Sequence, residues 1–238
     1  MNILYKHELS IVDFLHDFSN AESRIGKYQD KITAAYLDKD AALLEEIYLH
    51  FKYEDARTKR LLKFLVDELN GIATKKQFKQ LNYIFFKQNK WDEETLWLLF
   101  HIMDWYEMND LQELVDAVIK RCNSKNTNAR LRQLMIRITI RYLDICFKRG
   151  EKNKVDTVFD FLKSLPNTAD MRMYKIIAVY YDKLFGQKYD EASDIANLKI
   201  GCILISDSDG YCCYYSYISK YLVRGFSCLE NPFCIECI

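Results

Sequence analysis

The sequence predicts an all-helical fold, and three observations support this prediction. The 238 residues include seven glycines and two prolines, far below the roughly 7% and 5% of an average protein, so few residues suit tight hairpin turns. Apolar residues make up half of the chain and recur at the three- and four-residue spacing of amphipathic helices. Short polar breaks separate these segments. These observations together predict a succession of helices packed around a substantial core.

The expected helices can be placed in chain order from this spacing and from the residues that begin and end them. Asp40 and Asp92 are suitable N-caps, because a carboxylate accepts hydrogen bonds from the free N–H groups of a first turn. Asn70 and Gly71 form a helix stop. The predicted spans are about 21–37, 40–51, 55–70, 75–89, 92–107, 109–123, 127–149, 151–165, 168–187, 189–206 and 208–224.

Alternate helices begin near residues 21, 55, 92, 127 and 168, close to the roughly 34-residue period of tetratricopeptide (TPR) repeats. Such helix pairs bury their apolar faces only by stacking, which produces a superhelix with a concave face. We therefore expect residues 21–224 to form a TPR-like right-handed superhelix of stacked antiparallel helix pairs with a C-terminal capping helix. We expect the Cys-rich tail at 225–238, which follows this domain, to be flexible.

Charge and hydropathy exclude several classes of function. Lysine plus arginine equals aspartate plus glutamate at 34 each, so the chain has no overall attraction to a phosphate backbone. The amino terminus, MNILYKHELSIVDFLHDF, has charged residues where a signal peptide needs an apolar run, and no stretch approaches the roughly 18 apolar residues of a membrane span. We expect a cytoplasmic protein with no membrane contact and with free thiols.

No motif in the chain indicates an enzyme. The four histidines (His7, His16, His50 and His101) are not in an HExxH or HxxxH arrangement. There is no Gly-rich phosphate loop and no G-x-S-x-G sequence. We expect no catalytic residues, no metal and no cofactor.

The tail CLENPFCIECI is the one candidate for metal or redox chemistry. Cys234 and Cys237 have C-x-x-C spacing and Cys228 is nearby, but a structural zinc site needs four ligands. A redox C-x-x-C is expected at a helix start in a βαβ setting, which this chain lacks. Removal of the last ten residues would abolish function under this alternative, which is weaker than the interpretation as a frayed terminus.

The segment NARLRQLMIRITIRYLDICFKR carries two apolar stripes, which indicates a helix packed from two directions. One stripe is formed by Leu131, Leu134, Met135, Ile138, Tyr142, Ile145 and Cys146, and the other by Ile136, Ile140, Leu143 and Phe147. An inner helix of a superhelix is packed in this way and presents one edge to the concave surface.

That edge carries Arg130, Arg137, Arg141 and Lys148, with Asp144 among them. The planar guanidinium suits a peptide carboxylate or main-chain carbonyls, so these cations are candidate ligand contacts. The alternative is a solvated charged edge, partly paired by Asp144 three residues after Arg141. Periodicity alone does not separate these two interpretations.

Tyr174 and Tyr181 are seven residues apart and share one helix face. Core packing is the commoner explanation of such a pair, and a ligand platform is the alternative.

Several segments together resemble the C-terminal repeat domain of the Rgg/GadR/MutR transcription regulators, which belong to the Gram-positive receptors for short peptide pheromones. They are ELSIVDFLHDF, KWDEETLWLLF, LRQLMIRITI, MYKIIAVYYDKLFGQ and GYCCYYSYISKYL, in order along essentially the whole chain. The resemblance implies a homodimer that binds a short hydrophobic signalling peptide in its concave groove and controls a helix-turn-helix domain. Residues 1–20 resemble only a linker helix at the end of that DNA-binding domain, so DNA contact would come through a domain that is absent here.

The resemblance also implies which residues meet the peptide. Arg137 stands where family members often have asparagine on the inner helix, and local match adds Arg141, Tyr174 and Tyr181. With Arg130 from the same edge, these are the predicted peptide-binding residues. The alternative function is a stand-alone helical-repeat adaptor, which would bind a protein partner and not respond to short hydrophobic peptides.

Overall fold

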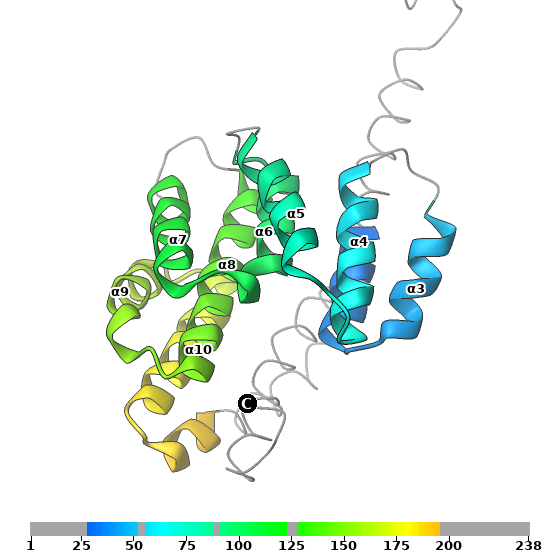
Figure 1. The fold of residues 1–238 in the computed structure, drawn as a ribbon. Helices are drawn as coiled ribbons and strands as arrows, with labels where there is room; N and C mark the ends of the chain where they lie inside the picture. The colour runs from blue at the N-terminus through cyan, green and yellow to red at the C-terminus, as the bar shows by residue number, and fades with distance from the viewer. Residues whose placement is uncertain (1–27, 52–55, 88–90, 123–127, 196–238) are drawn as a thin grey trace, which may run out of the picture. The chain divides into compact units, whose positions relative to one another are not determined.

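The structure is a computed structural model that describes residues 28–51, 56–87, 91–122 and 128–195 (Figure 1). Every regular element in these ranges is helical and none is a strand, which confirms the predicted all-α class. The linker helix predicted at 1–20, the helix predicted at 208–224 and the Cys-rich tail at 225–238 lie outside the described residues.

The described helices follow the predicted order. A first helix covers residues 28–37, and a last one covers 189–195 within the described part. Between them lie α3 (Ala41–His50), α4 (Ala56–Leu69), α5 (Lys75–Lys87), α6 (Glu93–Ile102), α7 (Met108–Cys122), α8 (Ala129–Arg149), α9 (Asp156–Ser164) and α10 (Ala169–Phe185). Two 3-10 helices, η1 (Met103–Trp105) and η2 (Lys152–Lys154), replace the end of the span predicted at 92–107 and the start of the span predicted at 151–165.

Local side-chain and backbone chemistry explains where these helices begin and end. Asp40 accepts a hydrogen bond from the backbone N–H of Leu43 at 2.9 Å, and Asp92 accepts one from Thr95 at 2.9 Å, which confirms both predicted N-caps. Gly150 ends α8 with a φ of 71°, a left-handed conformation that costs glycine little. Gly71 has the same φ two residues after α4 ends, as the predicted helix stop requires.

The chain divides into two compact units, Met1–Ala73 and Thr74–Ile238. In the first unit α3 packs against α4. Its core is formed by fully buried side chains, among them Ile32, Leu44, Leu61 and Leu65. The repeat domain predicted over 21–224 therefore extends across both units.

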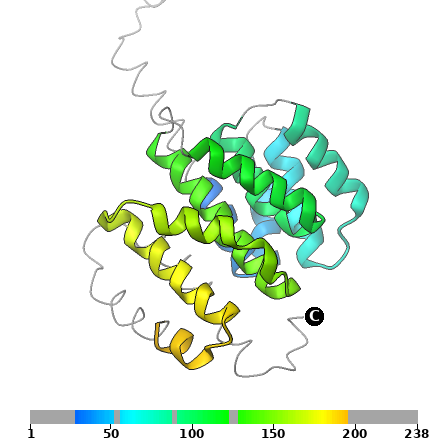
Figure 2. The same ribbon diagram turned by 90° about the vertical axis from the view of Figure 1, so that its left-hand side faces the viewer.

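In the second unit α8 is the central helix and contacts α6, α7, α9 and α10 (Figure 2). Both predicted apolar stripes of α8 are buried: Met135, Ile138 and Tyr142 on one side, Ile136 and Leu143 on the other, are all fully inaccessible to solvent. The prediction that this helix is packed from two directions is confirmed. The polar edge between the stripes keeps accessible surface at Arg130, Arg137 and Lys148.

No helix within the described ranges is both long enough and apolar enough to span a bilayer.

Candidate functional site

The polar edge of α8 is neutralised in the folded chain to a greater extent than the sequence indicated. Arg130 pairs with Glu93 at the start of α6, and Arg141 pairs with Asp104 in η1. Lys148 pairs with Asp144 at 2.8 Å within α8 itself. Asp144 is therefore engaged by Lys148, while a carboxylate from another element neutralises Arg141.

Arg141 is an almost completely buried cation. Its side chain is 7% exposed, and its guanidinium lies 4.9 Å from the ring centroid of Phe100 on α6. A charge with so little access to water needs a carboxylate partner, and the aromatic face adds a second favourable contact. Arg141 therefore belongs to the junction of α8 with α6 and η1.

A second arginine, Arg149, binds main-chain carbonyl oxygens of η1 and of the residue that follows it. The two terminal nitrogens of Arg149 donate to the carbonyl oxygens of Tyr106 at 2.9 Å and Asp104 at 2.5 Å. Burial acts to raise the pKa of the Asp104 carboxyl, but Arg141, Lys148 and Arg149 hold it below its ordinary value. Asp104 keeps 39% of its side-chain surface exposed, so solvent screens part of this attraction.

Tyr174 and Tyr181 are both in the core of the second unit, with 0% and 2% of their surface exposed. The hydroxyl of Tyr181 donates to Asp144 at 3.3 Å and so joins α10 to α8. The neighbouring Tyr180 packs edge-to-face on Tyr181, with ring centroids 5.5 Å apart. This burial supports the core-packing interpretation of the pair.

Of the five predicted peptide-binding residues, Arg130 and Arg137 retain solvent-accessible surface. Arg130 is exposed at the start of α8, and Arg137 is half-buried two turns further along the same edge. Helices α6 and α10 both contact α8. The accessible part of the candidate site is therefore the stretch of the α8 edge that includes Arg130 and Arg137.

The sequence placed Asp144 on this edge, but it did not reveal the partners that come from other elements. Glu93 and Asp104 come from elements 37 residues away from Arg130 and Arg141, and Arg149 reaches back 45 residues to the carbonyl of Asp104. No spacing rule within one helix relates residues so far apart. The sequence held one hint of these pairs, which is the negative charge of Glu93 in the first turn of α6.

His101 is a packing residue in this region. It is completely buried, its Nδ1 lies 2.8 Å from the carbonyl oxygen of Trp97, and its ring meets those of Trp97 and Phe100 edge-on. Burial lowers the pKa of His101 to about 3, and the charge of Arg141 acts in the same direction. The imidazole is therefore neutral and enclosed at physiological pH.

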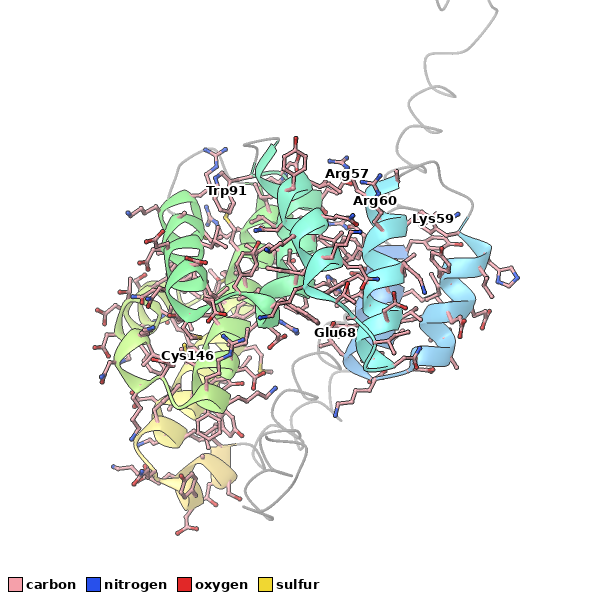
Figure 3. All side chains as sticks on the ribbon, viewed as in Figure 1. Arg57, Lys59, Arg60, Glu68, Trp91 and Cys146 are labelled. Carbon is pink, nitrogen blue, oxygen red and sulfur yellow. The ribbon has the colours of Figure 1, made fainter. Side chains whose placement is uncertain are left out.

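Within the described ranges, no three or more His, Cys, Asp or Glu side chains are grouped so that they could hold a metal ion. Cys122 and Cys146 are buried free thiols, and Cys146 lies on α8 (Figure 3). Cys228, Cys234 and Cys237 lie outside the described residues.

Comparison of the chain with models of protein families, with curated proteins and with solved structures gives no significant match. What the fold and this edge define is an all-helical protein with a polar helix edge set between packed helices.

Proposed function

We propose that this chain is the ligand-sensing domain of a transcription regulator, and that it binds a short hydrophobic signalling peptide along the α8 edge. The observation that carries the proposal is the position of Arg137, half-buried on a polar edge of α8 that lies between two stripes of buried apolar residues. The sequence resemblance to peptide-responsive regulators supplies the class of ligand. A helix-turn-helix domain would carry the output.

The helix contacts support a TPR-like superhelix for the second unit. Helices α6, α8 and α10 begin at Glu93, Ala129 and Ala169, hence 36 and 40 residues apart. Each contacts the next in this series, and α7 likewise contacts α9. First helices stacking on first helices and second on second is the arrangement expected of helix-pair repeats. In such a stack α8 is an inner helix, and its polar edge faces the concave side.

The five predicted residues divide into two roles under this proposal. Arg137 and Arg130 contact the peptide, because a guanidinium can donate two parallel hydrogen bonds to a carboxylate or to main-chain carbonyls. Arg141, Tyr174 and Tyr181 hold α8 against η1 and α10, and so keep the edge in place without touching the ligand.

Dimer geometry would transmit the signal. In the proposed regulator two copies of the repeat domain pair, and peptide binding shifts the relative positions of two DNA-binding domains. The chain itself needs no catalytic group for this function.

Calorimetric titration with short hydrophobic peptides encoded beside the gene tests the proposal. We expect micromolar or tighter binding that weakens by about 1–3 kcal/mol in Arg137→Ala, since a charge-assisted contact is lost. Arg137→Lys should recover only part of the affinity, because an ammonium cannot form the paired hydrogen bonds. Arg172→Ala, which removes an exposed arginine from α10, is the matched control and should bind normally.

The alternative is an adaptor that holds a protein partner. A folded chain that binds none of the peptides would favour the adaptor and contradict the sensing function. Equal weakening by Arg137→Ala and Arg172→Ala would contradict the location of the site.

A further inference from the structure

The solvent-facing side of α5 carries a cluster of lysines next to an exposed aromatic ring. Lys75, Lys76, Lys79, Gln80 and Tyr83 line an open hollow of about 560 Å³. Tyr83 is 65% exposed, which is unusual for a side chain that gains free energy from burial. This face of α5 is a separate surface from the α8 edge.

The opposite side of α5 fixes which residues point outward. Phe78 stacks on Trp105 with ring centroids 6.2 Å apart and meets Tyr106 edge-on at 5.0 Å. Leu81 is 2% exposed, and Asn82 accepts a hydrogen bond from the hydroxyl of Tyr106. Because these contacts prevent rotation of the helix, the lysines and Tyr83 stay on its outer face.

The described residues supply no negative charge that pairs with this face. Helix α5 contains no acidic residue, and within the part of the chain that the structure describes Lys75, Lys76 and Lys79 have no carboxylate partner. The first turn is closed by a neutral pair: the backbone N–H of Thr74 donates to Gln77 Oε1 at 2.8 Å, and that of Gln77 donates to Thr74 Oγ1 at 3.3 Å. A glutamate in place of Gln77 would have supplied the negative charge that this end of a helix favours.

Lysines on other helices have partners in the folded chain. In the first unit Lys63 pairs with Asp67 at 2.8 Å, and Lys59 lies 5.7 Å from the ring centroid of Tyr48. Lys59 is labelled on α4 in Figure 3. On α8, Lys148 is neutralised by Asp144. Within the described residues, the three lysines of α5 thus lack the carboxylate partners that Lys63 and Lys148 have.

We propose that the outer face of α5 docks an acidic segment of a partner protein. Carboxylates of the segment pair with Lys75, Lys76 and Lys79, and an apolar side chain of the segment packs on the ring of Tyr83. From Lys75 to Tyr83 the face covers nine residues, about 12 Å at the rise of an α-helix, which matches a few residues of a bound segment.

This small size favours an acidic protein segment over a nucleic acid. Phosphate-backbone binding relies on cations spread along a groove or stripe and on a basic domain, whereas this chain has a formal net charge of zero. A single helix face with three lysines and one aromatic ring instead provides a compact charged contact and one apolar contact.

Fluorescence anisotropy on the full chain tests this surface. The probe is a fluorescein-labelled peptide made of repeated Glu-Glu-Leu triplets. The same peptide with glutamine in place of each glutamate is its neutral counterpart. We expect saturable binding of the acidic probe that weakens as salt is raised, and at least a tenfold loss in the triple variant Lys75→Gln, Lys76→Gln, Lys79→Gln. Tyr83→Ser should weaken binding severalfold, since the apolar contact is lost.

Two controls separate a specific site from general attraction. The triple variant Lys31→Gln, Lys120→Gln, Lys152→Gln changes the net charge equally at exposed positions on other elements and should bind within twofold of the unaltered chain. The triple variant Lys75→Arg, Lys76→Arg, Lys79→Arg keeps the charge and should retain binding, which excludes the loss of a folded α5 as the cause of the effect.

The proposal fails if the two glutamine triple variants weaken binding equally, or if the chain does not distinguish the acidic probe from its neutral counterpart. It also fails if a twelve-nucleotide DNA single strand or a phosphatidylserine vesicle binds the chain more tightly than the acidic peptide does, and if the α5 glutamine triple variant abolishes that binding. Those results would assign the face to a nucleic acid or to a membrane surface. Because the probe site is on α5, Arg137→Ala should leave this binding unchanged whatever its effect on signalling peptides.

Discussion

The guanidinium of Arg141 on α8 pairs with the carboxylate of Asp104, which lies 37 residues earlier in the 3-10 helix η1. The pair is asymmetric, because the arginine side chain is 7% exposed and the aspartate 39%. The carboxylate can regain water when the pair is broken, but the arginine cannot. Arg141 therefore depends on Asp104 much more than Asp104 depends on Arg141.

This asymmetry predicts unequal costs of mutation. Asp104→Ala leaves a buried cation, so we expect the free energy of unfolding to fall by about 1–3 kcal/mol, below the cost of a fully buried pair because the aspartate is partly exposed. Arg141→Met, which keeps volume and removes the charge, should cost less. Urea unfolding of both variants and of the double variant measures the coupling.

The Lys148 and Asp144 pair provides the reference for this measurement. Lys148 is 48% exposed, so Lys148→Ala should change the free energy of unfolding by about 0.5 kcal/mol or less. A loss in Asp104→Ala no greater than that in Lys148→Ala would show that the Arg141 charge is not held by Asp104.

Burial of His101 predicts a specific pH dependence of stability. Its pKa is about 3 in the folded chain and about 6.5 when unfolded, so between these values the unfolded state binds the extra proton. Stability should thus be fully present above pH 6.5 and fall as pH decreases toward 3, by at most about 1.4 kcal/mol per pH unit from this group. Urea unfolding between pH 8 and pH 4 measures the slope.

His101→Gln should flatten this slope whatever its effect on stability at pH 8. The matched control is His50→Gln on α3, where the ring is exposed and hydrogen-bonds the carbonyl of Glu46. Asp104, whose pKa is lowered, adds a loss of the same sign near pH 4 and below in both variants. An unchanged slope in His101→Gln would contradict the buried neutral imidazole.

Tyr180 and Tyr181 should respond oppositely to loss of their hydroxyl groups. The buried hydroxyl of Tyr180 has no hydrogen-bond partner among the described residues, whereas that of Tyr181 donates to Asp144. Tyr180→Phe should leave stability unchanged or raise it by up to about 1 kcal/mol, and Tyr181→Phe should lower it by about 0.5–1.5 kcal/mol. Thermal unfolding followed by circular dichroism compares the two.

Tyrosine ionisation gives a second measurement of the same environment. Burial and the nearby charge of Asp144 raise the pKa of Tyr180 to about 12. A difference between the ultraviolet titrations of the unaltered chain and Tyr180→Phe should therefore appear only near pH 12. A difference centred near pH 10 would indicate an exposed ring.

The two described cysteines should resist alkylation in the folded chain. Burial raises the pKa of the Cys146 thiol to about 11, and also raises that of Cys122. At pH 8 the thiolate fraction at pKa 11 is lower by at least about 100-fold than that of an ordinary cysteine, and burial further limits access. Mass spectrometry after iodoacetamide treatment, with urea-unfolded protein as control, measures both sites; rapid labelling of Cys146 without urea would contradict its burial.

The local features of the fold were readable from the sequence because each depends on neighbours within about one helical turn. Asp92 caps α6 through an N–H three residues away, and Gly150 ends α8 through its own φ. The stripes of α8 follow from the 3.6-residue period alone, and their burial agrees with it. The sequence did not reveal that the helix predicted at 92–107 tightens into η1.

The candidate site was only partly readable. The sequence placed Arg130, Arg137 and Arg141 on one edge, but it could not rank them, because their exposure depends on which carboxylates other helices bring near. The structure buries Arg141 against Asp104 and Phe100 and leaves Arg137 half-buried. The lysines of α5 were not singled out, because a short run of exposed cations is common on helix surfaces.

The sequence by itself therefore determined the all-helical class, the helix order and the faces that each helix buries, since spacing and capping act over three or four residues. Only the tertiary structure decided which charges are neutralised: Arg141 by Asp104 across 37 residues, and Lys75, Lys76 and Lys79 by no described carboxylate. The physical reason is that the free energy of a charge depends on its water access and on its nearest opposite charge. Both are set by the packing of distant segments.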